Sequence, residues 1–276
     1  MIELKNIYFS YFVPEKVDIL KNINFNINKG EFISIIGKNG SGKSTLGRLI
    51  AFLLEPTKGE IYIDGKKIKN ELDYLEIRKK IGMVFQNPDN QIVSQIVEED
   101  IAFGLENLNY DEETIRKKVE EVLIEVDLLE ERRFPPHFLS GGQRQKLAIA
   151  GVLVMEPEYI VLDEPTSLLD PKGRKDVIKL ITRLNKNGIT IILITHRMEE
   201  AMLGDRVIVL NNGEIALDGD PFEIFTNVEF LREIGLTVPP LTYLSYLLKN
   251  EGVPIEVKLW SLKEIKEELL QLKLKI

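Results

Sequence analysis

The first third of the chain alternates between apolar and polar residues, which is the pattern of β-strands with one buried face. The alternation covers residues 2–11, 19–28 and 60–67, and Asp64-Gly65 in the last segment is typical of a hairpin turn. We therefore predict an antiparallel sheet at the edge of the fold.

Three short runs are mostly apolar, at 31–36, 159–162 and 189–194. The last two are nearly all apolar and rich in β-branched residues, which is typical of central parallel strands that are buried on both faces. Helical spacing follows the first run at 44–54 and lies between the other two at 171–185, where Gly188 ends it. The alternation predicts an α/β fold with a parallel sheet flanked by helices.

Residues 98–156 are mostly helical in pattern, with clear segments at 111–129 and 143–155. This predicts a helical subdomain inserted at about 88–156. A further hairpin with an Asn-Gly turn is predicted at 207–215.

The C-terminal tail has its own pattern. Pro239-Pro240 indicates a linker, so we expect a main domain at 1–236 and a C-terminal domain at 237–276. In the tail, Ser261 and Glu264 form a capping-box pattern that begins an amphipathic helix. The apolar stripe of this helix must be buried against another element, and it consists of Ile265, Leu269 and Leu272.

Composition and charge exclude several classes of protein. The 276 residues carry a formal net charge of -8, which argues against binding nucleic acid through a basic face. The absence of cysteine excludes disulfides and cysteine-based metal sites. No apolar run approaches the roughly 18 residues of a membrane span, and residues 1–6 do not begin a signal peptide. We expect a globular intracellular protein that reaches a membrane only through a partner.

A glycine-rich loop follows the first apolar run and has the spacing G-x-x-x-x-G-K-S/T. In this motif backbone N–H groups surround a polyphosphate, the lysine bridges the β- and γ-phosphates, and the hydroxyl binds Mg²⁺. Strand, loop and helix occur in the required order, which predicts a nucleotide-binding P-loop NTPase (RecA-like) fold rather than an ordinary turn. The predicted binding residues are Gly37, Lys38, Asn39, Gly40, Ser41, Gly42, Lys43, Ser44 and Thr45.

Polar residues follow the other two apolar runs: Asp163 and Glu164 after the first, and His196 after the second. Open α/β sheets bind ligands at the carboxyl ends of their strands, so these side chains are expected to face the nucleotide. Asp163 would hold Mg²⁺, Glu164 would orient or deprotonate the attacking water, and His196 would contact the γ-phosphate. The alternatives are a solvated strand end for the carboxylates and a structural role for the histidine.

A second candidate anion site is formed by Ser140, Gly141, Gly142 and Gln143 at the start of a predicted helix. Unpaired N–H groups and the helix dipole favour a phosphate at such a position. We expect a chain with both motifs to close around one nucleotide.

The order and spacing of these motifs, together with Gln86 and residues 167–170, resemble the ATP-binding-cassette (ABC) ATPases over about the first 230 residues. In that family two cassettes sandwich two ATP molecules head to tail. The resemblance implies that residues 139–143 press on the γ-phosphate held by a second subunit. It also implies that Gln86 approaches Mg²⁺ and links the site to a transport partner, and that Asp170 crosses between subunits.

The same resemblance makes Tyr11 the aromatic residue that stacks on adenine. Phe9 and Phe12 are close enough in sequence to take that place, and each of the three is about as well explained by packing in the strand. Residues 167–170 read Ser-Leu-Leu-Asp where the family more commonly has Ser-Ala-Leu-Asp, so Leu168 departs from the family pattern.

A narrower resemblance, to the energy-coupling factor (ECF) transporter ATPases, covers residues 87–93, 97–107 and 231–236. It implies an ATPase subunit of a vitamin or metal-ion importer, peripheral at the cytoplasmic face of the cell membrane. Its implied partners are a transmembrane coupling protein and a substrate-binding membrane component, and the C-terminal domain would help it dimerise. Four apolar residues would form a groove for a coupling helix or belong to the core: Ile92, Val93, Ile96 and Val97.

Two other functions are open at this point. A soluble ABC ATPase acting on nucleic acid or ribosomes is disfavoured by the acidic charge, the single cassette and the absence of cysteine. A nucleotide sensor without turnover is disfavoured because Glu164 and His196 are both present. We therefore expect an ATPase that pairs with a second ABC subunit, either another copy or a paralogue.

Overall fold

The N-terminal strands form the predicted antiparallel sheet. The computed structural model describes residues 1–12, 15–68, 73, 77, 79–259 and 261–273. Its smaller sheet has the strand order β2-β1-β4-β5 with antiparallel neighbours. Asp64 and Gly65 have φ angles of 49° and 78°, which the predicted hairpin turn requires. The strands are β1 (Ile2–Phe12), β2 (Lys16–Ile27), β4 (Lys58–Ile63) and β5 (Lys66–Lys67).

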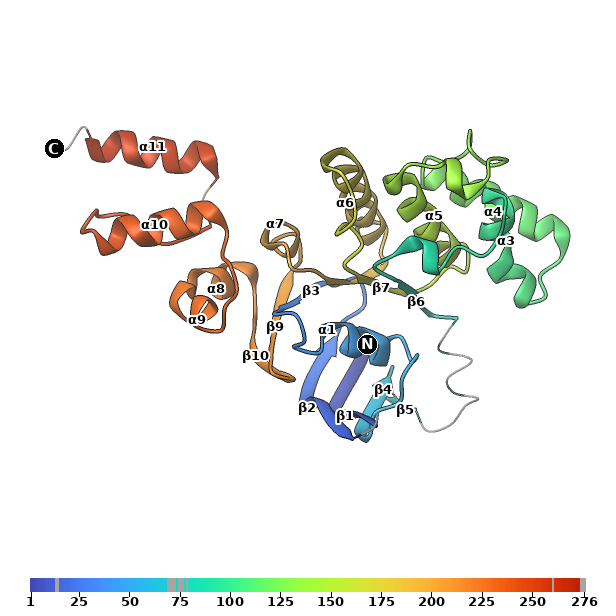
Figure 1. Cartoon of the computed structure of the whole chain (residues 1–276), viewed down its shortest axis with the longest axis horizontal. Helices are drawn as coiled ribbons and strands as arrows, with labels where there is room; N and C mark the ends of the chain where they lie inside the picture. Colours follow the sequence, from blue (N-terminus) through green and yellow to red (C-terminus); the bar gives the residue numbers. More distant parts are fainter. Residues whose placement is uncertain (13–14, 69–72, 74–76, 78, 260, 274–276) are drawn as a thin grey trace.

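The main sheet is parallel except for one edge strand, in the order β10-β9-β3-β8-β7-β6 (Figure 1). The three apolar runs of the sequence form β3, β7 and β8 at its centre. The predicted hairpin at 207–215 supplies β9 and the antiparallel edge strand β10. The strands are β3 (Phe32–Gly37), β6 (Ile81–Val84), β7 (Tyr159–Asp163), β8 (Thr190–Ile194), β9 (Arg206–Asn211) and β10 (Glu214–Gly219).

Strand β6 was not predicted from the sequence because it is only four residues long and contains a glycine. Gly82 lies so close to Val152 of α5 (Gly141–Leu153) that a Cβ atom there would collide with the valine side chain. The glycine therefore allows the helix to pack directly on the sheet. The strand matters for the site because Gln86 follows its end and because β6 pairs with β7.

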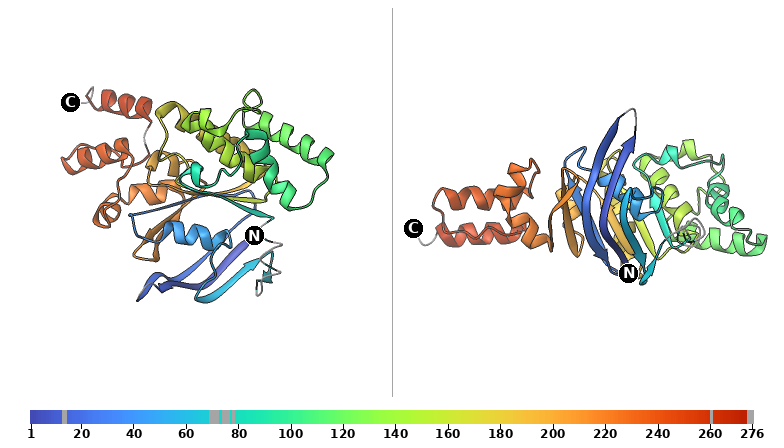
Figure 2. Two further views of the ribbon diagram at one scale, coloured as in Figure 1. Left: turned by 45° about the vertical axis from the view of Figure 1, so that its right-hand side comes forward. Right: turned by 90° about the horizontal axis from the view of Figure 1, so that it is seen from below.

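Both faces of the main sheet are covered, as the α/β prediction requires (Figure 2). Successive residues of β7 alternate between two cores: Tyr159 and Val161 pack in one, and Ile160 and Leu162 pack in the other. The first core includes α1 (Lys43–Ile50) and the antiparallel sheet. The second includes α5 and three further helices, α3 (Val97–Asn107), α4 (Glu112–Glu125) and α6 (Pro171–Lys186).

Some predicted helix ends are wrong by a few residues. Helix α1 ends at Ile50 rather than at Leu54, because Phe52 adopts a positive φ of 55° that no helix can continue through. The predicted helix at 111–129 ends at Glu125, since Asp127 has a φ of 53°. Short 3₁₀ turns precede α3 and α5, namely η1 (Pro88–Asn90) and η2 (Pro136–Phe138).

The C-terminal segment extends the core at one edge of the main sheet. Val238 is buried in a cluster with Val209 of β9 and Phe225, and Tyr243 packs against the same cluster. Pro240, predicted to lie in a linker, is the first residue of a helix. The helices after β8 are α7 (Met198–Ala201), α8 (Pro221–Thr226), α9 (Val228–Glu233), α10 (Pro240–Asn250) and α11 (Leu262–Lys273).

The predicted capping box at the start of α11 is confirmed. The Ser261 backbone N–H donates to Glu264 Oε2 at 2.8 Å, and the Glu264 N–H donates to Ser261 Oγ at 3.2 Å. Ile265 is buried against Ile255, and Leu269 and Leu272 pack on the same cluster. Helices α10 and α11 lie at the opposite end of the molecule from α3–α5 (Figure 1). Across the described residues, no helix combines the length and apolar character needed to cross a membrane.

Candidate functional site

The glycine-rich loop joins β3 to α1 and wraps around a lysine amine. Gly40 and Gly42 have φ angles of 80° and 103°, conformations that favour glycine. Lys43 Nζ donates to the carbonyl oxygens of Gly37 at 2.8 Å and Lys38 at 3.0 Å. Burial lowers the pKa of Lys43, and the nearby carboxylates of Glu164 and Asp163 partly oppose this shift. A bound polyphosphate would add direct charge-assisted hydrogen bonds to this desolvated cation.

Ser44 and Asp163 form the second part of the site. Ser44 Oγ donates to Asp163 Oδ1 at 3.0 Å, which joins the start of α1 to the end of β7. Burial raises the pKa of Asp163, while the hydrogen bond from Ser44 lowers it. A hydroxyl and a carboxylate are the oxygen ligands that Mg²⁺ accepts beside a nucleotide. These two side chains therefore fit the metal that the fold implies.

Glu164 brings the three predicted catalytic residues together. Its Oε2 lies 3.1 Å from His196 Nδ1 and accepts a hydrogen bond from Gln86 Nε2 at 3.4 Å. The backbone N–H of Glu164 donates to Ile194 O at 2.9 Å, which ties the ends of β7 and β8 together. Glu164 has a φ of 48°, an uncommon conformation for a residue with a side chain and one that clusters at functional sites.

These elements surround a pocket of about 420 Å³, a volume typical of small-ligand sites. The side chain of Ile19 from β2 also lines it, a contribution that sequence reasoning missed because Ile19 is simply an apolar strand residue. Six other predicted site residues are not among those around this pocket: Tyr11, Gly37, Lys38, Ser41, Asp163 and His196. Lys38 instead packs against Gly235. The lining residues are Ile19, Asn39, Gly40, Gly42, Lys43, Ser44, Thr45, Gln86 and Glu164.

The second motif begins α5, as predicted, and its polar groups cap the helix. Ser140 Oγ accepts from Gln143 N at 3.3 Å, and Gln143 Oε1 accepts from Ser140 N at 3.0 Å. Asp170 caps α6 in the same way, accepting from Gly173 N at 3.1 Å. The two helix starts are in contact, since a Cβ atom on Gly142 would lie 2.9 Å from Gly173 Cα.

The two motifs do not enclose one pocket within a single chain. Residues 140–143 and Asp170 are absent from the lining of the 420 Å³ pocket, so the expectation that one chain closes around the nucleotide is wrong. The physical reason is that the motifs begin different helices, α1 and α5, which pack in different cores of the sheet. At the start of α5, Ser140 is exposed and Gly141 is partly exposed, whereas Gly142 is buried, so another molecule can reach the first of these residues.

Comparison with known proteins identifies the family. The model of the ABC transporter family matches residues 20–167. The chain belongs to the ABC transporter family. This ABC protein is 50% identical over 276 residues to the energy-coupling factor transporter ATP-binding protein EcfA1 of Clostridium novyi, covering 99% of each chain. It is 52% identical to the protein of the same name from Caldanaerobacter subterraneus, covering 97% and 98%.

Two solved structures are similar to this ABC protein. One is the cbiO1 protein of Clostridium perfringens, described as part of the ABC transporter complex cbiONQ, with 39% identity and a TM-score of 0.76 over 88% of this chain and 97% of that one. The other is a dimeric ATP-binding cassette in a post-hydrolysis state, bound to ADP and Pi. It has 37% identity and a TM-score of 0.72 over 80% and 99% of the two chains.

The three candidates for adenine stacking in this ABC protein differ in exposure. Phe9 is 7% exposed and belongs to the core, so it presents no free face. Tyr11 is half-buried, with its ring edge-on to Phe9 at a centroid distance of 4.8 Å, and Phe12 is 66% exposed. Tyr11 therefore stays a prediction, with Phe12 as the accessible alternative. Leu168, where the sequence departs from the family, is exposed beside Asp170.

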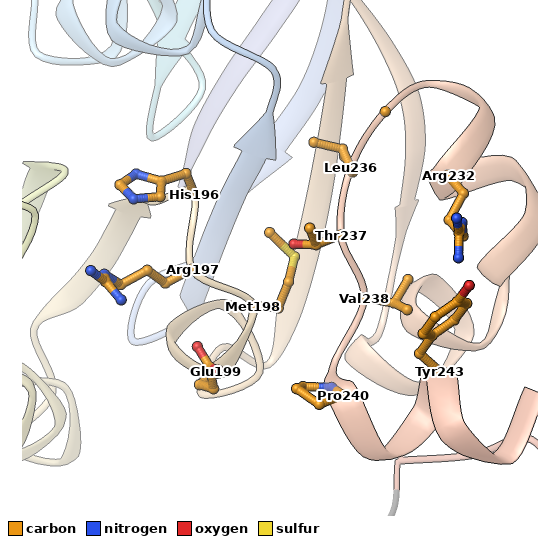
Figure 3. A pocket seen from close by; sticks show the side chains of 11 residues that line it. His196, Arg197, Met198, Glu199, Arg232, Leu236, Thr237, Val238, Pro240 and Tyr243 are labelled. Atoms are coloured by element: carbon orange, nitrogen blue, oxygen red, sulfur yellow. The ribbon is translucent and has the colours of Figure 1, made fainter.

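A further pocket of about 710 Å³ begins at His196 and lies between α7 and the segment before α10 (Figure 3). Figure 3 shows His196 and Arg197 on one side and Arg232 with Tyr243 on the other. The Arg232 guanidinium lies 4.4 Å from the centre of the Tyr243 ring. Sequence reasoning missed this pocket because the tail packs there through tertiary contacts that no local pattern encodes.

Proposed function

We propose that this ABC protein is the ATP-hydrolysing subunit of an ECF-type importer that energises uptake of a vitamin or metal ion. One observation supports hydrolysis above all: the Glu164 carboxylate lies 3.1 Å from His196 and 3.4 Å from Gln86, beside the pocket that contains Lys43. The transport assignment is supported by the full-length similarity to energy-coupling factor ATP-binding proteins.

In the proposed reaction, the loop amides and Lys43 bind the phosphates of ATP, and Glu164 orients or deprotonates a water for in-line attack on the γ-phosphorus. His196 contacts the γ-phosphate and, through Nδ1, holds the Glu164 carboxylate. Ser44 and Asp163, with Gln86 nearby, would hold Mg²⁺, which when bound neutralises charge on the phosphate oxygens. Catalysis then comes mostly from positioning and electrostatics.

The proposed working unit is a dimer of ABC subunits, either two copies or this chain with a paralogue. Ser140, Gly141, Gly142, Gln143 and Asp170 lie away from the pocket of their own chain, and the start of α5 can offer N–H groups to a phosphate. The similarity to a dimeric cassette with ADP and Pi supports this arrangement. The C-terminal domain at 237–276 is proposed to contribute to the dimer contact.

The proposed membrane contact is an apolar groove of about 610 Å³ between β6, α3 and α5. Three exposed apolar side chains line it, Leu53, Val93 and Phe103, which suits an amphipathic helix from a transmembrane coupling protein. Of the four residues predicted for such a groove, only Val93 lines it. Val97 is fully buried in the core, so its assignment to the groove is wrong.

The subunit would then be peripheral at the cytoplasmic face of the membrane, with a substrate-binding membrane component completing the complex. Purification of the tagged chain from detergent-solubilised membranes, followed by mass spectrometry, tests the assignment. We expect a second ABC subunit, or only this one, together with two membrane proteins and no nucleic acid. Co-purification with ribosomes or DNA would instead support the soluble ABC alternative, which the transporter relatives disfavour.

A further inference from the structure

Glu200, on the short helix α7, is a buried carboxylate that the catalytic scheme does not use. Glu200 is only 4% exposed, and both oxygens of its carboxylate accept hydrogen bonds from threonine hydroxyls. Thr166 Oγ1 donates to Oε1 at 2.5 Å, and Thr195 Oγ1 donates to Oε2 at 2.7 Å. Arg197 Nε also lies 3.9 Å from Oε1. A carboxylate is costly to bury, so this arrangement depends on these partners being in place.

The two threonines belong to the two loops that carry the reacting side chains. Thr166 lies two residues after Glu164, and Thr195 immediately precedes His196. The Arg197 backbone N–H also donates to Thr195 Oγ1 at 3.1 Å, which fixes the residue on the other side of the histidine. Glu200 therefore connects the loop after β7 to the loop after β8 from within the protein.

We propose that Glu200 is a positioning residue that sets the distance and orientation between Glu164 and His196. The inference rests on the proposed ATPase function and deepens it. Glu164 and His196 are joined by a single 3.1 Å contact, and Glu164 has an uncommon φ of 48°. Both loops must therefore be held in place by other contacts for this geometry to persist. The Glu200 carboxylate provides such contacts, because one of its oxygens accepts a hydrogen bond from each loop.

Helix α7 is itself held in place by apolar packing against the C-terminal segment. Met198 is buried in the cluster that contains Val238, so α7 is packed against the segment that leads into α10 (Figure 3). Glu199 is exposed on the same helix and lines the outer pocket. It has the same charge as Glu200 but does not contact either threonine, which makes it a matched control.

The experiment measures kcat, KM and nucleotide affinity in the assembled complex for Glu200→Ala, Glu200→Gln and Glu199→Ala. Glu200→Ala should lower kcat by roughly 10- to 100-fold, because a small misplacement of reacting groups costs rates of this size. The Kd for an ATP analogue should change less than about twofold, since Glu200 does not line the P-loop pocket. Glu200→Gln keeps one acceptor oxygen, and its amide N–H can donate to the other threonine hydroxyl, so it should recover most of the activity. Glu199→Ala should match the wild type.

A second variant separates positioning from simple loss of stability. Thr195→Val has nearly the shape of threonine and removes one of the two hydroxyl hydrogen bonds to Glu200, while the carboxylate itself stays in place. We expect it to lower kcat roughly tenfold in the wild type but less than about twofold in a His196→Ala background, because effects that act through one group are not additive.

An equal loss in both backgrounds, or wild-type kcat in folded Glu200→Ala, overturns the positioning role while the ATPase assignment stands. No ATP hydrolysis by the wild-type complex would instead contradict the proposed function.

Discussion

Glu164 Oε2 and His196 Nδ1 lie 3.1 Å apart because the strands that precede them are neighbours in register. Asp163 of β7 pairs with Ile194 of β8, so the two loops leave the same edge of the sheet together. Ligand sites of open α/β sheets form at this edge. A carboxylate held by an imidazole is well placed to orient a water beside a bound phosphate.

Glu164→Gln should abolish most ATP hydrolysis while leaving ATP binding intact. The amide cannot accept a proton from water, and general-base catalysis typically contributes about 10²–10⁴-fold in rate. We expect phosphate release from the assembled complex to fall by at least about 100-fold, and the variant to accumulate as a closed dimer with ATP in size-exclusion chromatography. Glu121→Gln, an exposed change on α4, is the control. Wild-type phosphate release by Glu164→Gln would refute the assigned role.

Lys43→Ala should weaken nucleotide binding rather than the chemical step alone. The lysine amine is buried inside the loop and is the cation best placed for the phosphates, so its loss removes charge-assisted hydrogen bonds. We expect at least about a tenfold rise in Kd in a titration with a fluorescent ATP analogue. Lys117→Ala, on the exposed side of α4, should leave Kd unchanged. An unchanged titration for Lys43→Ala would contradict the placement of the phosphates.

The glycine-rich loop and the central strands could be predicted because their signals are local. The apolar runs that became β3, β7 and β8 and the turn at Asp64-Gly65 depend on neighbouring residues only. The convergence of Glu164 and His196 was also predictable, because parallel strands bring their carboxyl ends to one edge.

The features that sequence reasoning missed depend on tertiary contacts. Gly82 weakens the strand pattern of β6 in the sequence. The same glycine is needed in the fold because a Cβ atom there would collide with Val152 of α5. Glu200 lies in the polar run Glu199-Glu200, which by itself indicates a solvated helix face. Its buried carboxylate is satisfied by hydrogen bonds from Thr166 and Thr195, and nothing in the local sequence marks either threonine as its partner.

Gly142→Ala should destabilise the contact between the starts of α5 and α6. The new Cβ atom would lie 2.9 Å from Gly173 Cα, a backbone atom that cannot move without its helix. Overpacking of this kind costs about 1–3 kcal/mol in the free energy of unfolding. Gly141→Ala is the matched comparison, because its Cβ would meet only the Leu169 side chain at 3.4 Å. Urea unfolding of both variants measures the difference. Equal unfolding midpoints would contradict the prediction that a Cβ atom on Gly142 collides with Gly173.

The hydroxyl of Tyr159 should make stability depend on pH at the alkaline end. Burial raises the pKa of Tyr159 from about 10 to about 12, with a smaller contribution in the same direction from the Asp64 carboxylate. Because the folded state keeps this proton longer than the unfolded state, its contribution is complete below pH 10 and is lost as pH rises toward about 12. Two pKa units correspond to at most about 2.7 kcal/mol. In urea unfolding at a series of pH values, Tyr159→Phe should show a shallower decline than the wild type between pH 10 and 12. Parallel declines for the two proteins would contradict this assignment, and Tyr8→Phe, an exposed change on β1, serves as the control.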